Sequence, residues 1–376
     1  MTQLFTQQLS GMLDLVADLV GIESPSSNRE ATAACAAAVL DAGKDLLGEP
    51  GEAVVVDGTT HVRWRFGSAG NQPGGVLLIG HLDTVWPMGT LARWPFTVSQ
   101  QDDRATGPGS FDMKAGLVQM LYALRSLDSL DGITVLITAD EEIGSITSRQ
   151  LIEQEAAGKD AALVLEPGVG EALKTARKGV SVYEVGVVGR AAHAGLEPEK
   201  GANATIELAH QVLRLSAVAR PELGTTVTPT VATSGTTTNT VPAAARLHVD
   251  VRALTVAEQE RVDVEIRATT PTVDGAEVRI GGGINRPPLP ATASAALLDR
   301  ANRVAESLGL PRLEGVEVGG GSDGNFTAGA GVPTLDGLGA VGGNAHGEGE
   351  FIVPSKMPER TALLAGLIES LRTNPL

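Results

Sequence analysis

The chain has 376 residues, of which 42% are hydrophobic and 3% aromatic, and its formal net charge is −16. This length exceeds what a single hydrophobic core usually organises, so we expect two domains. The negative charge argues against nucleic acids and anionic membranes as partners, because both carry charge of the same sign.

The sequence gives no sign of export or membrane insertion. The first residues lack the basic and apolar regions of a signal peptide, and no apolar run approaches the roughly 20 residues of a membrane span. The single cysteine, Cys35, cannot form an internal disulfide, which fits a reducing compartment. We therefore expect a cytoplasmic protein in which Cys35 is a small buried residue on an Ala-rich helix. The alternative for Cys35 is a reactive thiol.

Apolar patterns in the first half of the chain predict helices that alternate with strands. The predicted elements are a helix over 11–20, a strand over 75–79, a helix within 112–127 that begins after Asp112, and strands over 134–138 and 162–165. Strands that alternate with helices usually form a parallel sheet. This part of the sequence therefore predicts an α/β fold with a mixed, largely parallel sheet and flanking helices.

The pattern changes after residue 177. Strands and helices then follow in the order β-α-β-β-α-β, at 181–189, 203–215, 225–235, 245–254, 255–268 and 276–282. This order predicts a ferredoxin-like sandwich over residues 178–287, and the prolines of "NRPPLP" mark the exit from it. A helix over 291–308 and a strand near 332–338 then resume the α/β pattern. We therefore expect one domain built from residues 1–177 and 288–376, with the 178–287 domain inserted into it.

Residues that can bind metals or move protons recur directly beyond the predicted strands. His81 and Asp83 follow the first strand two positions apart, so both side chains face one side of an extended segment. Glu141 and Glu142 follow the next strand, and Glu166 follows the third. Because ligands of open α/β sheets bind beyond the carboxyl ends of the strands, this placement predicts a shared site.

Two further residues complete the group. Asp112 stands immediately before a predicted helix, and His346 lies in the glycine-rich segment "GGNAHGEGE". Each feature alone has a structural explanation: Asp112 could cap a helix, and His81 with Asp83 could be a turn pair. The repetition of one arrangement at several strand ends favours the functional interpretation.

The group contains two imidazoles and three carboxylates, which suits two divalent ions. If one carboxylate bridges, each ion receives three protein ligands from the set His81, Asp112, Glu142, Glu166 and His346. Nitrogen and oxygen ligands without thiolate favour zinc, with cobalt or manganese as alternatives. Two-metal sites polarise a carbonyl and activate a water, and Glu141 remains as the general base for that water.

Long motifs relate these residues to a known family. The segments "GHLDTVWP", "GPGSFDMKAG", "TADEEIGS", "LEP" and "GRAAHAGLEPEKGANA" resemble the zinc exopeptidase family, which includes glutamate carboxypeptidases of the G type, aminoacylases and succinyl-diaminopimelate desuccinylase. The resemblance covers essentially the whole chain. The segment "GGGSDGNF" at 319–326 brings it nearest to the glutamate carboxypeptidase branch.

The resemblance implies a role for each residue of the group. The two zinc-binding sets, which share Asp112 as a bridge, are His81, Asp112 and Glu166 for one ion and Asp112, Glu142 and His346 for the other. Glu141 would take a proton from the attacking water and return it to the leaving amine. Asp83 would support His81, since a carboxylate commonly fixes the second nitrogen of a ligating imidazole. The Asp112–Met113 peptide bond would be cis.

The resemblance also assigns polar residues outside the metal site. His193 would come from the partner subunit of a homodimer and stabilise the oxyanion; without the family context, a solvated loop histidine is as good an interpretation. Candidate substrate-binding residues are Asn239, Arg252, Arg286 and Ser322. Arg252 can bind a carboxylate through two hydrogen bonds or form a strand-end ion pair, and Ser322 can offer its backbone N–H. The other histidines, His61, His210 and His248, are interpreted as surface or satisfied core residues.

The sequence therefore predicts a dizinc hydrolase that cleaves an amide bond next to a free carboxylate and releases a C-terminal amino acid such as glutamate. The alternative is an aminoacylase or desuccinylase that acts on N-acyl amino acids. A catalytically inactive binding protein on the same scaffold is a third interpretation, which the presence of Glu141 and all the ligands disfavours. The expected partners are a small peptide or N-acyl amino acid and a second copy of the chain, bound through the inserted domain, with no nucleic acid and no membrane.

Overall fold

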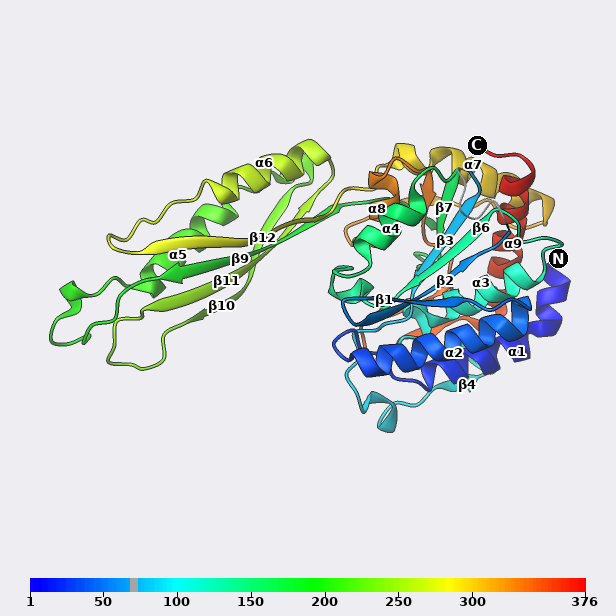
Figure 1. Ribbon diagram of the computed structural model, residues 1–376, viewed down its shortest axis with the longest axis horizontal. Coiled ribbons are helices and arrows are strands. Elements are labelled where there is room, and N and C mark those ends of the chain that lie inside the picture. The colour runs from blue at the N-terminus through cyan, green and yellow to red at the C-terminus, as the bar shows by residue number, and fades with distance from the viewer. Residues whose placement is uncertain (68–73) are drawn as a thin grey trace. The chain divides into compact units, whose positions relative to one another are not determined.

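The computed structural model describes residues 1–67 and 74–376, which form two compact units (Figure 1). The first unit consists of residues 1–176, 289–318 and 322–376, and the second of residues 177–288 with 319–321. Within the second unit, the guanidinium of Arg177 donates hydrogen bonds to the carbonyls of Gly320 and Gly321 in the short segment 319–321.

A mixed sheet forms the centre of the first unit. Its strands, in spatial order, are β1 (Glu52–Val56), β2 (Thr59–Arg65), β6 (Ile133–Thr138), β3 (Val76–His81), β7 (Ala161–Val164) and β14 (Thr334–Leu335). The strands from β6 to β14 run parallel, whereas β1 pairs with β2, and β2 with β6, in antiparallel fashion. This is the largely parallel sheet that the sequence predicts.

The central strands were predictable because they are buried along their whole length. β3, β6 and β7 contain only buried residues, and strands covered on both faces read as continuous apolar runs. The strand expected near 332–338 is limited to Thr334–Leu335. The hairpin of β1 and β2 was missed, although its turn residues Asp57 and Gly58 both have positive φ and are a pair that tight hairpin turns favour.

Helices cover both faces of this sheet. They are α1 (Thr2–Val20), α2 (Arg29–Leu47), α3 (Ala115–Arg125), α4 (Arg149–Ala156), α7 (Ala291–Ser307), α8 (Gly324–Gly329) and α9 (Met357–Thr373). Side chains of α1, α2, α3 and α9 share one core with Leu78 and Val135, whereas those of α4 and α8 share another with Leu77 and Leu136. Successive strand residues enter different cores because they point to opposite faces.

The helical predictions hold, with differences at the ends. The range 11–20 is the second half of α1, and the helix expected after Asp112 begins at Ala115. Cys35 is buried on α2, as expected for a small core residue. None of the helices in the described part of the chain combines the length and apolar character that a membrane crossing requires.

A small sheet brings two distant loops of the first unit together. Its strands, in spatial order, are β15 (Gly342–Gly343), β16 (Phe351–Ile352), β5 (Arg104–Thr106) and β4 (Thr97–Ser99). Phe351 pairs with both Gly343 and Thr106. The segment that leads to Asp112 therefore lies beside the loop that carries His346. A separate two-stranded ladder joins β8 (Leu173–Arg177) and β13 (Gly315–Val318).

The second unit has the element order predicted for the insert. Its elements are β9 (Gly179–Val188), α5 (Ala204–Ser216), β10 (Thr226–Ser234), β11 (Ala244–Ala253), α6 (Val256–Arg267) and β12 (Glu277–Arg286). The strands form an antiparallel sheet in the order β10-β11-β9-β12. Both helices pack on this sheet, where Leu208 and Val262 share a core with Tyr183. β10 lies at an edge of the sheet.

Candidate active site

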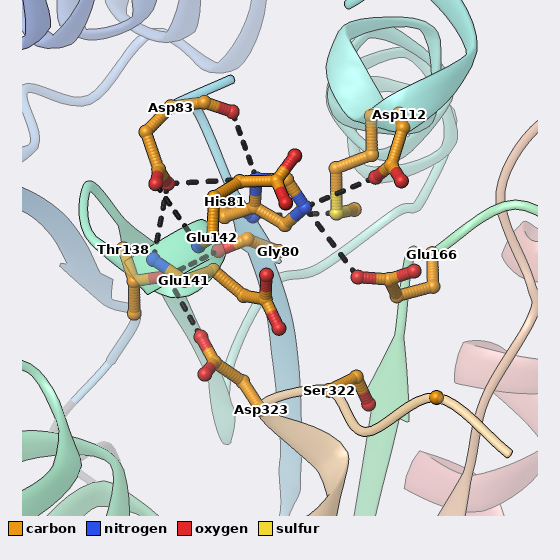
Figure 2. Close-up of polar contacts among 12 residues, drawn as sticks. Gly80, His81, Asp83, Asp112, Thr138, Glu141, Glu142, Glu166, Ser322 and Asp323 are labelled. Atoms are coloured by element: carbon orange, nitrogen blue, oxygen red, sulfur yellow. Dashed lines mark hydrogen bonds and ion pairs between the residues drawn. The ribbon is translucent and has the colours of Figure 1, made fainter. Parts of the chain in front are cut away.

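The predicted ligands that follow strands converge at one edge of the sheet in the first unit (Figure 2). His81 is the last residue of β3, Glu141 and Glu142 open a 3-10 turn shortly beyond β6, and Glu166 lies shortly beyond β7. β3 pairs in parallel with both β6 and β7, so the carboxyl ends of the three strands share this edge.

Asp112 and His346 reach the same edge from outside the sheet. Asp112 lies in the kinked turn Ser110–Lys114 that leads into α3, and the Asp112–Met113 peptide bond is cis, as the resemblance implied. His346 lies in the loop between β15 and β16 and has a φ of 61°. This left-handed conformation costs a non-glycine residue roughly 1–2 kcal/mol, so other contacts of the loop must offset it.

The carboxylate of Asp112 lies between the two imidazoles. Its Oδ1 is 3.2 Å from Nε2 of His81, and its Oδ2 is 3.4 Å from Nε2 of His346. Each imidazole also approaches a carboxylate of its own: Oε1 of Glu166 is 3.4 Å from Nε2 of His81, and both oxygens of Glu142 are 3.2 Å from Nε2 of His346. The contacts therefore divide into two groups that share Asp112.

This donor set suits divalent cations that prefer nitrogen and oxygen ligands. It consists of imidazoles and carboxylates, and the one cysteine, Cys35, is buried on α2. Ligand atoms of His81, Glu141 and Glu166 lie within 4.8 Å of one another, and Glu141 is buried. The residues present thus fit a dinuclear metal centre with a further carboxylate beside it.

The close packing of imidazoles and carboxylates shifts the pKa values of the site residues. Burial opposes ionisation of Asp112, but hydrogen bonds from His346 and His81 lower its pKa overall. Hydrogen bonds to Asp112 and Glu142 raise the pKa of His346 to about 10. Burial lowers the pKa of His81, yet hydrogen bonds with the surrounding carboxylates outweigh it, so this pKa is also raised. Burial is the main reason that the pKa of Glu142 is raised.

Asp83 supports the site in a broader way than expected. Its backbone carbonyl contacts Nδ1 of His81 at 3.0 Å, whereas its carboxylate is 3.5 Å from that nitrogen. The carboxylate instead accepts hydrogen bonds from Ser26 Oγ (2.6 Å) and from the backbone N–H groups of Glu141 and Glu142 (both 3.2 Å). One residue therefore contacts a predicted ligand and also the turn that carries Glu141 and Glu142.

A buried network behind this turn was not identified from the sequence. The carboxylate of Asp140 accepts hydrogen bonds from the N–H (2.6 Å) and Oγ1 (2.8 Å) of Thr147 and from Oγ of Ser148 (2.6 Å). His61 is fully buried; its Nδ1 accepts from the N–H of Ala139 (3.2 Å), and its Nε2 contacts Oγ1 of Thr147 (3.0 Å). His61 is therefore a core residue with satisfied hydrogen bonds, as interpreted from the sequence. Thr147 and Ser148, which follow Asp140 in the sequence, were the pattern that could have indicated this network.

Ser322 requires a correction. It lies in the first unit, where its Oγ donates to Asp336 (2.6 Å) and its backbone N–H donates to Oδ1 of Asn325 (2.9 Å). The N–H that we expected to meet a substrate is therefore engaged within the chain. Its neighbour Asp323 accepts a hydrogen bond from Thr138 at the end of β6 (2.7 Å), which ties this segment to the site edge (Figure 2).

The second unit holds the other predicted residues. His193 is exposed, and its Nδ1 accepts hydrogen bonds from the N–H groups of Gly195 (3.2 Å) and Leu196 (3.1 Å). This leaves Nε2 as the nitrogen that carries the hydrogen. The N–H of Ala194 donates to the carbonyl of Asn239 (2.9 Å), so the two predicted residues lie on adjoining loops.

Three basic residues, Arg252 and Arg286 in the second unit and Lys174 in the first, have different contacts. Arg252 makes the strand-end ion pair that was its alternative interpretation, through two hydrogen bonds to Asp250 (2.9 and 2.8 Å). Arg286 is buried at the end of β12. Lys174, which the sequence did not single out, lies in the first unit with its Nζ 3.6 Å from Oε2 of Glu166. It places a positive charge beside one ligand.

Comparison with known proteins identifies the family. The profile of Peptidase family M20/M25/M40 matches residues 77–370, which include every predicted metal ligand. The chain belongs to this family. The resemblance drawn from its motifs is thereby confirmed, and the chain is an M20-family hydrolase of the metal-dependent peptidase and amidohydrolase type.

Relatives of this M20-family hydrolase include two kinds of enzyme. Carboxypeptidase G2 from Pseudomonas sp. (strain RS-16) is 33% identical over 387 residues, which cover 98% of this chain and 91% of that enzyme. Acetylornithine deacetylase from Salmonella arizonae is 35% identical over 224 residues, which cover 55% of this chain and 58% of that enzyme.

Solved structures share the fold. A tripeptidase from Staphylococcus aureus has a TM-score of 0.75 at 20% identity and covers 97% of this chain and 99% of its own. An M20 family metallo-carboxypeptidase from Sulfolobus solfataricus has a TM-score of 0.74 at 18% identity and covers 95% of this chain and 99% of its own. At these identities the likeness concerns the fold, and both units take part in it.

Proposed function

We propose that the chain is a dinuclear zinc hydrolase that cleaves an amide bond next to a free carboxylate and releases a C-terminal amino acid such as glutamate. The observation that carries this proposal is the Asp112 carboxylate, whose two oxygens face His81 and His346 separately. Members of the family are typically dinuclear metal enzymes. Cobalt or manganese would suit the same donors.

The residues would divide the chemistry between them. When bound, the two ions would polarise the scissile carbonyl and lower the pKa of the attacking water. The carboxylate of Glu141 would accept a proton from that water and return it to the departing amine nitrogen. Asp83 would keep Glu141 and His81 in place through the contacts described above.

The substrate preference rests on the relatives. The match with carboxypeptidase G2 extends over nearly the whole chain, which favours a peptide-like or acylated C-terminal amino acid. The partial match with acetylornithine deacetylase supports a second candidate, hydrolysis of N-acyl amino acids. Both reactions would use the same residues, so the difference lies in the substrate pocket.

We also propose that the second unit completes the active site of a homodimer. His193 would donate its Nε2–H to the oxyanion that forms on the scissile carbonyl, and Asn239 on the adjoining loop would contact the same group. Arg252 and Arg286 would bind the substrate carboxylate. For Arg252 this requires exchange of its partner Asp250 for the substrate.

A hydrolysis screen tests the proposal. The enzyme, loaded with zinc, is offered N-acyl amino acids and dipeptides with a free C-terminal carboxylate, each beside its C-terminal amide. We expect cleavage of the free acids and little cleavage of the amides. Equal cleavage of both would refute recognition of the carboxylate. Preference for an acylated glutamate over an N-acetylated basic amino acid would favour the carboxypeptidase, and the reverse would favour the deacylase.

A further inference from the structure

Glu350 is a fully buried carboxylate at the end of the loop that carries His346. It accepts hydrogen bonds from the backbone N–H groups of Gly109 (3.0 Å), Phe111 (2.8 Å) and Asp112 (2.9 Å) and from the indole N–H of Trp86 (2.9 Å). A buried carboxylate is costly unless its oxygens are satisfied, and here both oxygens are.

These contacts connect three segments, two of which contain a predicted metal ligand, while the third follows directly after one. Trp86 follows His81 in the loop after β3, and the three N–H groups belong to the turn that presents Asp112. Glu350 itself follows His346, whose left-handed backbone requires support from its own loop. One buried side chain therefore joins three segments that are separated in the sequence.

The arrangement requires a carboxylate rather than an amide. Oε1 accepts from Phe111 and Asp112, and Oε2 accepts from Gly109 and Trp86. All four partners are donors, so an amide nitrogen in place of either oxygen would face two N–H groups and satisfy neither.

We propose that Glu350 is a positioning residue that holds the Asp112 carboxylate between the two imidazoles and thereby sets the affinity for the second ion, the one assigned to Asp112, Glu142 and His346. The proposal rests on the proposed dinuclear function. The second ion is affected most because Glu350 binds the backbone of Asp112 and shares a loop with His346. Removal of an outer partner of a metal ligand typically weakens binding about 10–100-fold.

The test compares metal titrations of the wild type, Glu350→Gln and a matched control, Glu155→Gln, in competition with a chelator. Glu155 is also a buried carboxylate of the first unit, but it pairs with Arg63 and Arg65 beside the strand end opposite the site. Thermal melts measure how much stability each variant loses. The readout is the affinity for each ion rather than turnover.

We expect Glu350→Gln to bind the second ion about 10–100-fold more weakly and the first ion, which shares Asp112, more weakly by a smaller factor, while Glu155→Gln binds both normally. Wild-type affinity for the second ion in folded Glu350→Gln would overturn the proposal, as would equal weakening in the control. If the wild type binds fewer than two ions, the proposed dinuclear function is refuted. The proposed role of Glu350 toward the second ion is then refuted as well.

If Glu350→Gln does not fold, hydrogen exchange of the metal-free wild type tests the positioning of Asp112, and the metal titration is carried out with Glu350→Asp. The amide hydrogens of Phe111 and Asp112 should be protected to a degree comparable with those of β3, because Glu350 holds them. Exchange at the rate of an exposed loop would overturn the proposal. Glu350→Asp offers a second variant: it keeps the charge but is too short to reach all four donors, and it should also weaken the second ion.

Discussion

Asp83 shows how much a single residue contributes beyond the ligands themselves. Its carbonyl orients His81, while its carboxylate holds the N–H groups of Glu141 and Glu142. The spacing of His81 and Asp83, taken together with the similar residues beyond the other strands, predicted that both belong to the site. It could not reveal which oxygen of Asp83 meets the imidazole, because that depends on the backbone angles of the turn between them.

Glu141 gives the first test of the assigned roles. We predict that Glu141→Gln retains both metal ions and loses about 10²–10⁴-fold in kcat, because an amide cannot accept the proton of the attacking water. Metal analysis of the purified variant and steady-state kinetics provide the measurement. A variant that turns over at close to the wild-type rate would show that Glu141 is not the base.

The protonation of the ligands predicts how metal binding depends on pH. In the metal-free protein Asp112 and Glu142 raise the pKa of His346 to about 10, so this imidazole is protonated at neutral pH. A divalent ion needs the neutral form. Binding should therefore release protons, and affinity should rise with pH up to about 10. Calorimetric titrations at mildly acidic and mildly alkaline pH in two buffers would measure this. An affinity independent of pH would contradict it.

Among the strands, those that are fully buried and at least four residues long could be predicted from the sequence. β3, β6 and β7 could be predicted because strands that are buried on both faces consist of continuous apolar runs. β15 and β16 could not, since two residues each carry no periodicity and their pairing depends on contacts with distant β5. Glu350 was missed for the same reason. Its segment "GEGE" reads as a solvated turn, and only the tertiary fold surrounds it with donors.

The approach of α3 to the end of β7 offers a test at this scale. A Cβ atom on Gly116 would lie 2.3 Å from the carbonyl oxygen of Leu165, and a backbone carbonyl cannot rotate out of its way. We predict that Gly116→Ala costs roughly 1–3 kcal/mol of stability. It should also weaken metal binding, because α3 follows Asp112 and Leu165 precedes Glu166.

The matched control for that prediction is Gly319→Ala, where an added Cβ meets no atom within 4 Å. Its unfolding free energy, from denaturant titration, and its metal affinity should stay close to the wild type. If Gly116→Ala is as stable as this control and binds metal as well, close packing of α3 on this strand end does not set the site.

For the molecule as a whole, the sequence separated the two units because the order of their elements differs. Alternation of strands and helices predicted the first, and the β-α-β-β-α-β order predicted the second. The proposed role of the second unit rests on His193, whose Nδ1 accepts hydrogen bonds from its own loop and whose Nε2 remains as a donor. In the proposed homodimer, this donor would serve the active site of the other subunit.

Subunit mixing tests that assembly. Glu141→Ala and His193→Ala homodimers should each be nearly inactive. After exchange of subunits, the heterodimer would contain one site with both residues intact, so part of the activity should return. His193→Ala protein mixed with a separately tagged His193→Ala protein is the control for exchange alone, and it should stay nearly inactive. No recovery after verified exchange, or full activity from a monomer, would leave His193 without a role across an interface.

The position of the second unit within the chain has a consequence for biosynthesis. The predicted ligands emerge from the ribosome in the order His81, Asp112, Glu142 and Glu166, and His346 follows only after the whole second unit. β14 and α9, which complete the sheet and one core of the first unit, emerge in that same late segment. A nascent chain would therefore contain the residues proposed for one ion well before it contains those proposed for both. Competence for the proposed hydrolysis would arrive only near the end of synthesis.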